Sequence, residues 1–233
     1  RRSSAASDVY KRQVLNILFV EQVKHDLSDD KLVNKSILPI RSGSRIGLFG
    51  GTFNPAHEWH QEVSKNALKE LKLDLIIWLV SASNPLKEEK DNFNFQDRYA
   101  SAREIAQSKD FFVSDFEIKF QTKYSIDTVT KIKELYPDVN FVWIMGSDCA
   151  AEIHKWKNWE QFLDLIPVAI YPRPEYEIES KKLNIIKEKA NQIDLKQNHE
   201  FATFKPPVIT FIPGPMSHIS SSLIRKIRKR GNA

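Results

Sequence analysis

The sequence predicts an α/β protein with a doubly wound, mostly parallel sheet and helices on both faces. Short β-rich apolar runs alternate with helix-like segments from residue 45 onwards, and segments of this length between strands are typical of βαβ units. A pair of glycines also follows the first apolar run, at the carboxyl end of the expected strand, where folds of this kind bind their ligands.

Six apolar runs form the expected strands, and none is long enough to span a bilayer. They are Ile46–Phe49, Leu75–Val80, Phe111–Phe116, Asn140–Met145, Val168–Tyr171 and Val208–Ile212.

Helical segments are expected between and after these runs. In the segment SIDTVTKIKELYP, Ser125 can cap a helix, the apolar residues from Ile126 to Leu135 form one stripe, and Pro137 ends it. The expected helices lie at about 58–72, 95–108, 126–136, 150–166, 180–193 and 220–230.

The chain of 233 residues is expected to have three parts. Residues 1–13, RRSSAASDVYKRQ, have no periodicity and resemble translated adapter sequence, so we expect a non-native leader. Residues 14–44 are polar and irregular and are interpreted as an extension. Residues 45–233 would form the domain that carries the function, a length that suits one globular unit.

Composition disfavours several functional classes. The net charge is +5, but four basic residues against Asp8 in the leader supply +3 of it, which leaves +2 and no case for nucleic-acid binding. The single cysteine, Cys149, rules out an internal disulfide and fits a reducing cytoplasm. No His/Cys spacing is typical of a zinc site, so no metal site built by the protein is expected.

The stretch GLFGGTFNPAHEWH, residues 47–60, carries the clearest chemistry. Glycines after a first strand can let the backbone approach a phosphate and adopt a positive φ. His57 and His60 share one face of a helix start, where they could donate hydrogen bonds to phosphoryl oxygens with help from the helix dipole. Two surface or core-edge histidines are the alternative. The stretch is neither the GxGxxG fingerprint nor a P-loop.

Two motifs carry a resemblance to a known family. GGTFNPAHEWH resembles the GG(S/T)F(D/N)PxHxGH signature of the HxGH nucleotidyltransferase superfamily, and ISSSLIR resembles its second signature, ISSTxIR. Further segments over roughly 45–225 are similar to bacterial nicotinate-nucleotide adenylyltransferases: SASNPLK (81–87), YSIDTV (124–129), MGSDCAAEIHKWKNW (145–159) and YPRP (171–174).

This resemblance implies a Rossmann-like fold of the nucleotidyltransferase type and an activity in NAD biosynthesis. The reaction would be adenylyl transfer from ATP to nicotinate mononucleotide, giving nicotinate adenine dinucleotide and pyrophosphate. Mg²⁺ held mainly by the phosphates of ATP is expected as cofactor. The implied partners are ATP and nicotinate mononucleotide, with no nucleic acid and no membrane; the oligomeric state stays open.

The resemblance also implies roles for individual residues. The expected catalytic residues are His57, His60 and Arg225, and the expected ATP-binding residues are Gly50, Gly51, Thr52, Phe53, Ser221 and Ser222. The expected substrate-binding residues are Asn84, Lys87, Ser125, Asp148 and Trp156. Structural alternatives are helix capping for Ser125 and Asp148, core packing for Trp156 and a plain surface position for Lys87.

Trp59 is the main departure from the family pattern, because the first signature has glycine there. An indole adds a large, rigid body, so it either turns away at the helix start or narrows the ATP site. Two alternatives remain open: the same superfamily with another acceptor, such as nicotinamide mononucleotide or phosphopantetheine, or, because of Trp59, a catalytically impaired relative that binds nucleotide.

Overall fold

The computed structural model describes residues 38–82, 93–174, 176, 181–196 and 200–231. For residues 228–231 it describes the backbone only. The chain divides into two units, Arg1–Pro39 and Ile40–Ala233. The expected leader 1–13 and nearly all of the expected extension 14–44 lie outside the described residues, and the second unit is the one described below.

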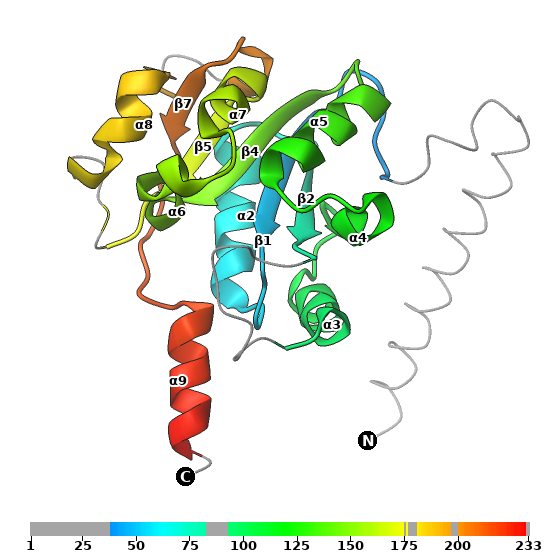
Figure 1. Cartoon of the computed structure of the whole chain (residues 1–233), viewed down its shortest axis with the longest axis vertical. Coiled ribbons are helices and arrows are strands. Elements are labelled where there is room, and N and C mark those ends of the chain that lie inside the picture. Colours follow the sequence, from blue (N-terminus) through cyan, green and yellow to red (C-terminus); the bar gives the residue numbers. More distant parts are fainter. Residues whose placement is uncertain (1–37, 83–92, 175, 177–180, 197–199, 232–233) are drawn as a thin grey trace, which may run out of the picture. The chain divides into compact units, whose positions relative to one another are not determined.

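Within the described residues, seven parallel strands form one sheet in the order β3-β2-β1-β4-β5-β7-β6 (Figure 1). The parallel, doubly wound sheet confirms the fold class expected from the sequence. The strands are β1 (Arg45–Gly51), β2 (Leu75–Val80), β3 (Phe111–Ser114), β4 (Asn140–Gly146), β5 (Val168–Tyr171), β6 (Asn191–Gln192) and β7 (Val208–Phe211).

Helices connect these strands and follow the last one. The α-helices are α2 (Glu58–Glu70), α3 (Phe95–Ile105), α4 (Phe116–Phe120), α5 (Ser125–Leu135), α6 (Ser147–Ala151), α7 (Trp159–Leu165), α8 (Asn184–Lys189) and α9 (Ser221–Gly231). Short 3₁₀ helices span Ile153–Lys155, Lys181–Leu183 and Phe201–Thr203.

Several expected boundaries are wrong. The expected helix at 150–166 is broken, because Trp156 is extended and Asn158 has a left-handed φ of 51°, which no α-helix accommodates. The strand expected to reach Phe116 ends at Ser114, and Phe116 begins α4. The helix expected at 180–193 ends at Lys189 because the chain then joins the sheet edge as β6.

Side chains cover both faces of the sheet. Trp78 of β2 and Val142 of β4 pack in one apolar cluster with Val63 of α2. Trp143, the next residue along β4, points to the opposite face, as strand geometry requires. There its ring meets Phe162 of α7 edge-on, with the ring centroids 5.4 Å apart. The sheet is thus a central layer between two layers of helices.

The strand order creates a ligand-binding position beside β1. The chain passes from β1 outward through β2 to β3, then crosses back to β4 on the other side of β1 (Figure 1). Connections that leave neighbouring strands in opposite directions open a crevice at their carboxyl ends, where α/β folds bind ligands.

Candidate active site

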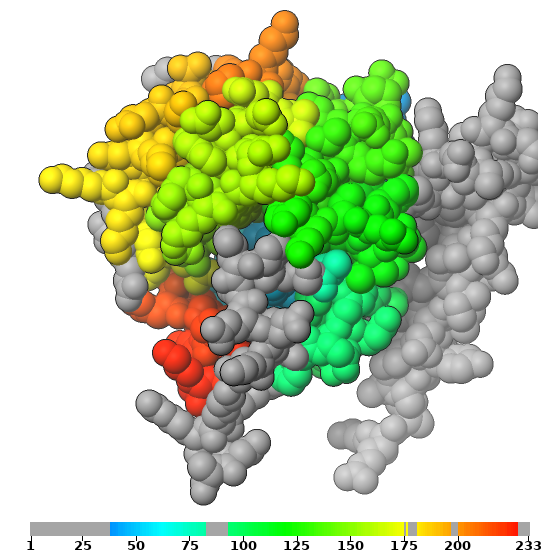
Figure 2. Space-filling model, viewed as in Figure 1, coloured from blue at the N-terminus to red at the C-terminus, as the bar shows by residue number. Residues whose placement is uncertain are grey.

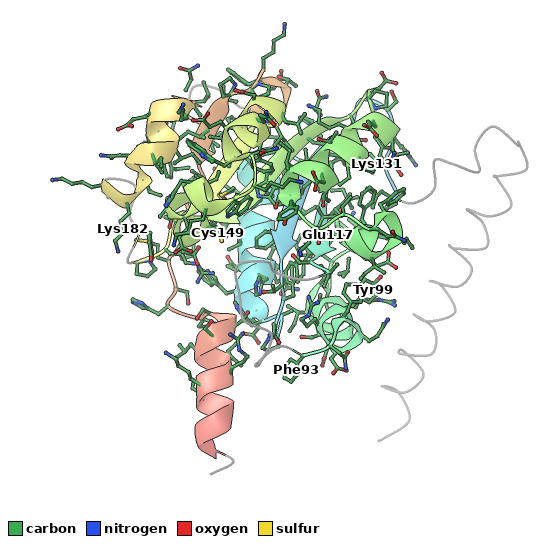
Figure 3. All side chains as sticks on the ribbon, viewed as in Figure 1. Phe93, Tyr99, Glu117, Lys131, Cys149 and Lys182 are labelled. Atoms are coloured by element: carbon green, nitrogen blue, oxygen red, sulfur yellow. The ribbon has the colours of Figure 1, made fainter. Side chains whose placement is uncertain are left out.

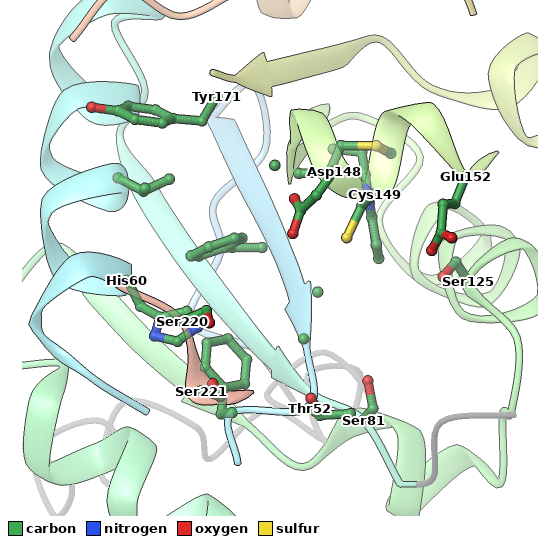
Figure 4. A pocket seen from close by; sticks show the side chains of 18 of the residues that line it. Thr52, His60, Ser81, Ser125, Asp148, Cys149, Glu152, Tyr171, Ser220 and Ser221 are labelled. Carbon is green, nitrogen blue, oxygen red and sulfur yellow. The ribbon is translucent and has the colours of Figure 1, made fainter. Parts of the chain in front are cut away.

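A cavity of about 370 Å³ lies at this crevice. In Figure 4, Thr52 and Ser81 lie at the ends of β1 and β2, Asp148 projects from α6, and His60 lies near Ser221. Figure 2 shows the recess as a small blue area, the colour of the β1 segment, between the green and yellow-green surfaces. The volume is within the range of small-molecule sites.

The cavity brings together most of the residues expected from the sequence. Arg225 is described but is not one of the residues lining the cavity. Asn84 and Lys87 lie outside the described residues. The expected residues that line the cavity are Gly50, Gly51, Thr52, Phe53, His57, His60, Ser125, Asp148, Trp156, Ser221 and Ser222.

The paired glycines differ in what they permit. A Cβ on Gly50 would come within 2.5 Å of the Trp143 ring, whereas a Cβ on Gly51 would lie 3.3 Å from the Phe53 ring. The positive φ expected of these glycines is instead found at Phe53, with φ 47°. Gly50 is therefore required for close packing of an indole beneath the cavity rather than for a left-handed backbone.

His57 and His60 lie together at the start of α2, with their ring centroids 3.9 Å apart. His57 has extended backbone and is the N-cap residue, and its backbone N–H donates to Nδ1 of His60 over 3.2 Å. The same Nδ1 lies 3.3 Å from the carbonyl of His57, so both backbone groups of His57 hold the His60 ring, and the tautomer of His60 depends on which of the two contacts is made. Neither ring nitrogen of buried His57 has a hydrogen-bond partner within the described residues.

Both imidazoles are held neutral. Burial, and then the positive charge of Arg173, lower the pKa of His57 to about 4. Burial lowers the pKa of His60 well below its ordinary value, and the neighbouring His57 adds to this. Two neutral rings at a helix N-terminus can donate hydrogen bonds, and an anionic ligand there would favour their protonation.

The second motif is hydrogen-bonded to the first. The Ser221 hydroxyl donates to the carbonyl of Pro55 over 2.9 Å, and the Arg225 guanidinium donates to the carbonyl of Asn54 over 2.5 Å. Arg225 also donates to the Ser222 hydroxyl over 3.2 Å. Segments more than 160 residues apart in the sequence thus meet at one wall of the cavity.

Asp148 forms an ion pair with Arg173, with Nε and Oδ1 3.4 Å apart. Gly146 permits this arrangement, since a Cβ there would lie 2.3 Å from the Asp148 carboxylate. Arg173 also donates to the carbonyl of Ile219, just before α9, over 3.0 Å. The sequence assigned no role to Arg173, although YPRP drew attention to it; only the fold shows that this cation faces the histidines.

Trp156 and Ser125 also line the cavity. The helix break places Trp156 in a turn, where its ring packs edge-on against Trp143 with centroids 6.3 Å apart. The N-cap of α5 is Tyr124, so Ser125 is the first helical residue and not the cap. The ammonium group of Lys157 lies 4.5 Å from the centroid of the Tyr124 ring and forms an ion pair with Asp127 over 3.3 Å. The ammonium group of Lys123 lies 5.9 Å from the same ring, so this edge carries two positive charges against one carboxylate.

Trp59 lines the cavity and is partly buried against the apolar cluster of α2. Its ring meets Tyr171 edge-on, with centroids 6.0 Å apart. The Tyr171 hydroxyl is itself fixed by donating to the carbonyl of Pro215 over 2.8 Å. The indole is therefore part of the wall and leaves the cavity open.

Two buried charges at the cavity were not identified from the sequence: Glu117 lines it, and Arg98 is not among the lining residues. Glu117 of α4 and Arg98 of α3 are each 5% exposed. Burial raises the pKa of Glu117 to about 7, against the opposing effects of the Ala82 N–H, Arg98 and Thr128. Burial lowers the pKa of Arg98, and Glu117 opposes this shift. The sequence offered one indication of Glu117, because this glutamate directly follows the apolar run Phe111–Phe116.

Metal and membrane sites were sought among the described residues. There, no three His, Cys, Asp or Glu side chains come together as a metal-binding group. Across the same part of the chain, no helix has the length and apolar character that a membrane span requires.

Comparisons with known proteins extend this picture. Residues 48–227 match the family model described as cytidylyltransferase-like. The chain is 37% identical over 188 residues to the "Probable nicotinate-nucleotide adenylyltransferase" of Caulobacter sp. (strain K31), covering 80% of this chain and 100% of the relative. It is also 37% identical over 187 residues to the protein of that name from Ruegeria sp. (strain TM1040), covering 80% and 97%.

A solved structure shows the same fold. Plasmodium falciparum nicotinic acid mononucleotide adenylyltransferase complexed with NaAD matches with a TM-score of 0.61 and 22% identity, over 78% of this chain and 83% of that one. The family model and the relatives together identify the chain, and it belongs to the cytidylyltransferase-like family, among the bacterial nicotinate-nucleotide adenylyltransferases.

Proposed function

We propose that this chain transfers the adenylyl group of ATP to nicotinate mononucleotide, giving nicotinate adenine dinucleotide and pyrophosphate. One observation supports this most: Ser221 and Arg225 of the second motif hydrogen-bond to the backbone of the first at one cavity. The names of the bacterial relatives agree with it. So do the ligands in the titles of the Plasmodium structures, NaAD and APC.

In the proposed reaction, a phosphate oxygen of nicotinate mononucleotide attacks the α-phosphorus of ATP. A P–O bond forms to the acceptor while the bond from the α-phosphorus to the bridging oxygen breaks, and pyrophosphate leaves with that electron pair. No bond to the protein is needed. The side chains therefore act by positioning the two reactants and by stabilising charge on the transferring group.

The phosphates of ATP would lie between the histidines and the start of α9. The imidazole of His60 would donate to a phosphoryl oxygen, and His57 has both ring nitrogens without a partner among the described residues. Among the described residues, Arg225 uses two of its five N–H groups on Asn54 and Ser222, which leaves three there for phosphate. Arg173 adds a second cation on the same side.

The acceptor nucleotide would occupy the side of the cavity lined by Ser125 and Trp156. An indole face suits stacking on a pyridine ring, and Asp148 could accept a hydrogen bond from a ribose hydroxyl. Lys123 and Lys157 at this edge, against the Asp127 carboxylate that pairs with Lys157, leave a positive balance that favours an anionic ligand. Asn84 and Lys87 remain predicted contacts to the acceptor.

Magnesium would enter as part of the Mg–ATP substrate. Two cavity carboxylates are already engaged, Asp148 with Arg173 at 3.4 Å and Glu152 with Lys155 at 2.6 Å. ATP phosphates are therefore the main ligands we expect for the ion, which is the usual mode for Mg²⁺ at nucleotide sites.

A direct test measures pyrophosphate release and dinucleotide formation from ATP and nicotinate mononucleotide. The expected result is turnover by the unaltered chain and a loss of roughly a hundredfold or more in kcat for His57→Ala, because a charge-stabilising donor is removed. A His154→Ala variant is a suitable control, since His154 does not line this cavity. Near-normal turnover in His57→Ala would refute its catalytic role.

A further inference from the structure

Two buried charges with no part in the proposed chemistry lie at the cavity wall: Glu117 is one of the residues that line the cavity, whereas Arg98 is not. Arg98 of α3 and Glu117 of α4 are each 5% exposed. Burying a charged group is costly unless hydrogen bonds and an opposite charge compensate. Figure 3 shows Glu117 on the inner side of α4, toward the sheet. The hydrogen bonds of these two side chains indicate their role.

Arg98 joins the ends of two strands. Its Nη1 donates to the carbonyl of Thr52, just after β1, and to the carbonyl of Ser81, just after β2, both over 2.8 Å. Its Nη2 donates to the carbonyl of Ala82 and its Nε to the carbonyl of Phe93, both over 3.2 Å. The carbonyls of Thr52, Ser81 and Ala82 lie beyond strand ends and have no ladder partner, whereas Phe93 lies just before α3. One guanidinium supplies the donors for all four carbonyls.

Glu117 holds the same backbone from the other direction. Its Oε2 accepts a hydrogen bond from the N–H of Ala82 over 2.9 Å. The Ala82 residue is thus fixed through its carbonyl by Arg98 and through its N–H by Glu117. The preceding N–H, that of Ser81, donates to the carbonyl of Gly51 over 2.9 Å, which ties β2 directly to the glycine turn.

The two strand ends held in this way form part of the cavity. Thr52 and Ser81 both line it, as Figure 4 shows. Thr52 belongs to the motif assigned to ATP, whereas Ser81 begins the segment assigned to the acceptor. The spacing between these residues therefore affects where each reactant lies relative to the other.

We propose that Arg98 and Glu117 are positioning residues that fix the spacing between Thr52 and Ser81, and thereby the alignment of the two substrates. This rests on the proposed function. Misalignment slows the chemical step without removing any contact to either substrate. Loss of the pair should therefore lower kcat while both KM values stay nearly unchanged.

The kinetic test compares Arg98→Lys with Arg103→Lys, an exposed position on the same helix. A lysine keeps the charge but cannot present donors to four carbonyls at once. We expect Arg98→Lys to lower kcat by roughly tenfold or more, with each KM changed less than about threefold. Arg103→Lys should match the unaltered chain. An unchanged kcat in Arg98→Lys would overturn the proposal.

Amide hydrogen exchange tests the pair without any assay of activity. Glu117→Ala should speed exchange of the Ala82 N–H by roughly tenfold or more, because its acceptor is lost, whereas Glu117→Gln retains an acceptor and should protect it. Exchange at Ile77, inside β2, should stay slow in both variants. Equal acceleration at Ala82 and Ile77 would overturn the proposal, since the pair would then stabilise the whole sheet.

These two readouts separate the proposal from the function on which it rests. If the unaltered chain shows no adenylyl transfer, the function is wrong, and the local effect at Ala82 still decides whether the pair fixes the strand end. If transfer occurs but Arg98→Lys raises a KM and leaves kcat intact, the pair supports one substrate contact and does not align the two reactants.

Discussion

The rings of His57 and His60 lie 3.9 Å apart at the start of α2, and both are neutral because they are buried. Their spacing in the sequence placed them on one helix face, and the fold adds the backbone bond from His57 to Nδ1 of His60. The His57 carbonyl lies 3.3 Å from the same Nδ1, so the backbone of His57 sets the direction of the His60 ring.

The two depressed pKa values predict how stability depends on pH. For His57, the pKa falls from 6.5 to about 4, so the unfolded chain binds more protons than the folded chain between these values. The free energy of unfolding should therefore decrease as the pH falls through this window, by about 1–3 kcal/mol for His57 after allowance for solvent screening. Denaturant unfolding at several pH values measures this decrease. If the free energy of unfolding of a His57→Gln chain depended on pH as steeply as that of the unaltered chain, the prediction would be contradicted.

Glu117 predicts a slope of the opposite sign. Its folded pKa of about 7 lies above its ordinary value of 4.5, so the folded chain binds more protons than the unfolded chain between the two. Stability contributed by this group should fall as the pH rises through that window, by at most about 3 kcal/mol. In Glu117→Gln this contribution disappears. A variant whose stability varies with pH as the unaltered chain does would show that Glu117 is not buried as described.

The glycine pair offers a matched comparison. Gly50→Ala would place a Cβ 2.5 Å from the Trp143 ring and should cost roughly 1–3 kcal/mol of stability. Gly51→Ala meets its nearest atom at 3.3 Å and should cost less than about 1 kcal/mol. Thermal unfolding compares them. The double variant Gly50→Ala with Trp143→Leu should recover part of the loss; strict additivity would argue against the contact.

Trp59 predicts a loss of stability more than a change in activity. Its ring packs against Tyr171 and the α2 cluster, so Trp59→Gly should cost roughly 2–4 kcal/mol through lost burial and a flexible helix start. Because the cavity stays open beside the indole, the KM for ATP should change less than about tenfold. An inactive unaltered chain that becomes active in Trp59→Gly would show that the indole blocks the site.

The sequence predicted the parts that depend on local pattern. The apolar stripe of α5, the central strands and the two motifs can each be recognised from a continuous stretch of sequence. The spacing of His57 and His60 predicted that they share one face at a helix start. Arg173, Arg98 and Glu117 could not be assigned, because their roles come from contacts with backbone and side chains distant in the sequence.

Local errors have local causes. The break at Trp156–Asn158 interrupts an otherwise helical pattern through one left-handed residue, Asn158, whose type tolerates that conformation without requiring it. The two-residue strand β6 carries no period of its own and pairs only because β7 is beside it. The positive φ falls on Phe53 and not on either glycine, which a preference for glycine cannot predict.

The most direct test of the account is kcat/KM for three acceptors with saturating Mg–ATP: nicotinate mononucleotide, nicotinamide mononucleotide and phosphopantetheine. The account predicts dinucleotide and pyrophosphate in equal amounts from nicotinate mononucleotide, with a kcat/KM at least roughly tenfold above the other two. The reason is that Lys123 and Lys157, against the single carboxylate of Asp127, leave an edge that favours the acid. A higher value for either other acceptor, or no turnover with any of the three, would contradict it.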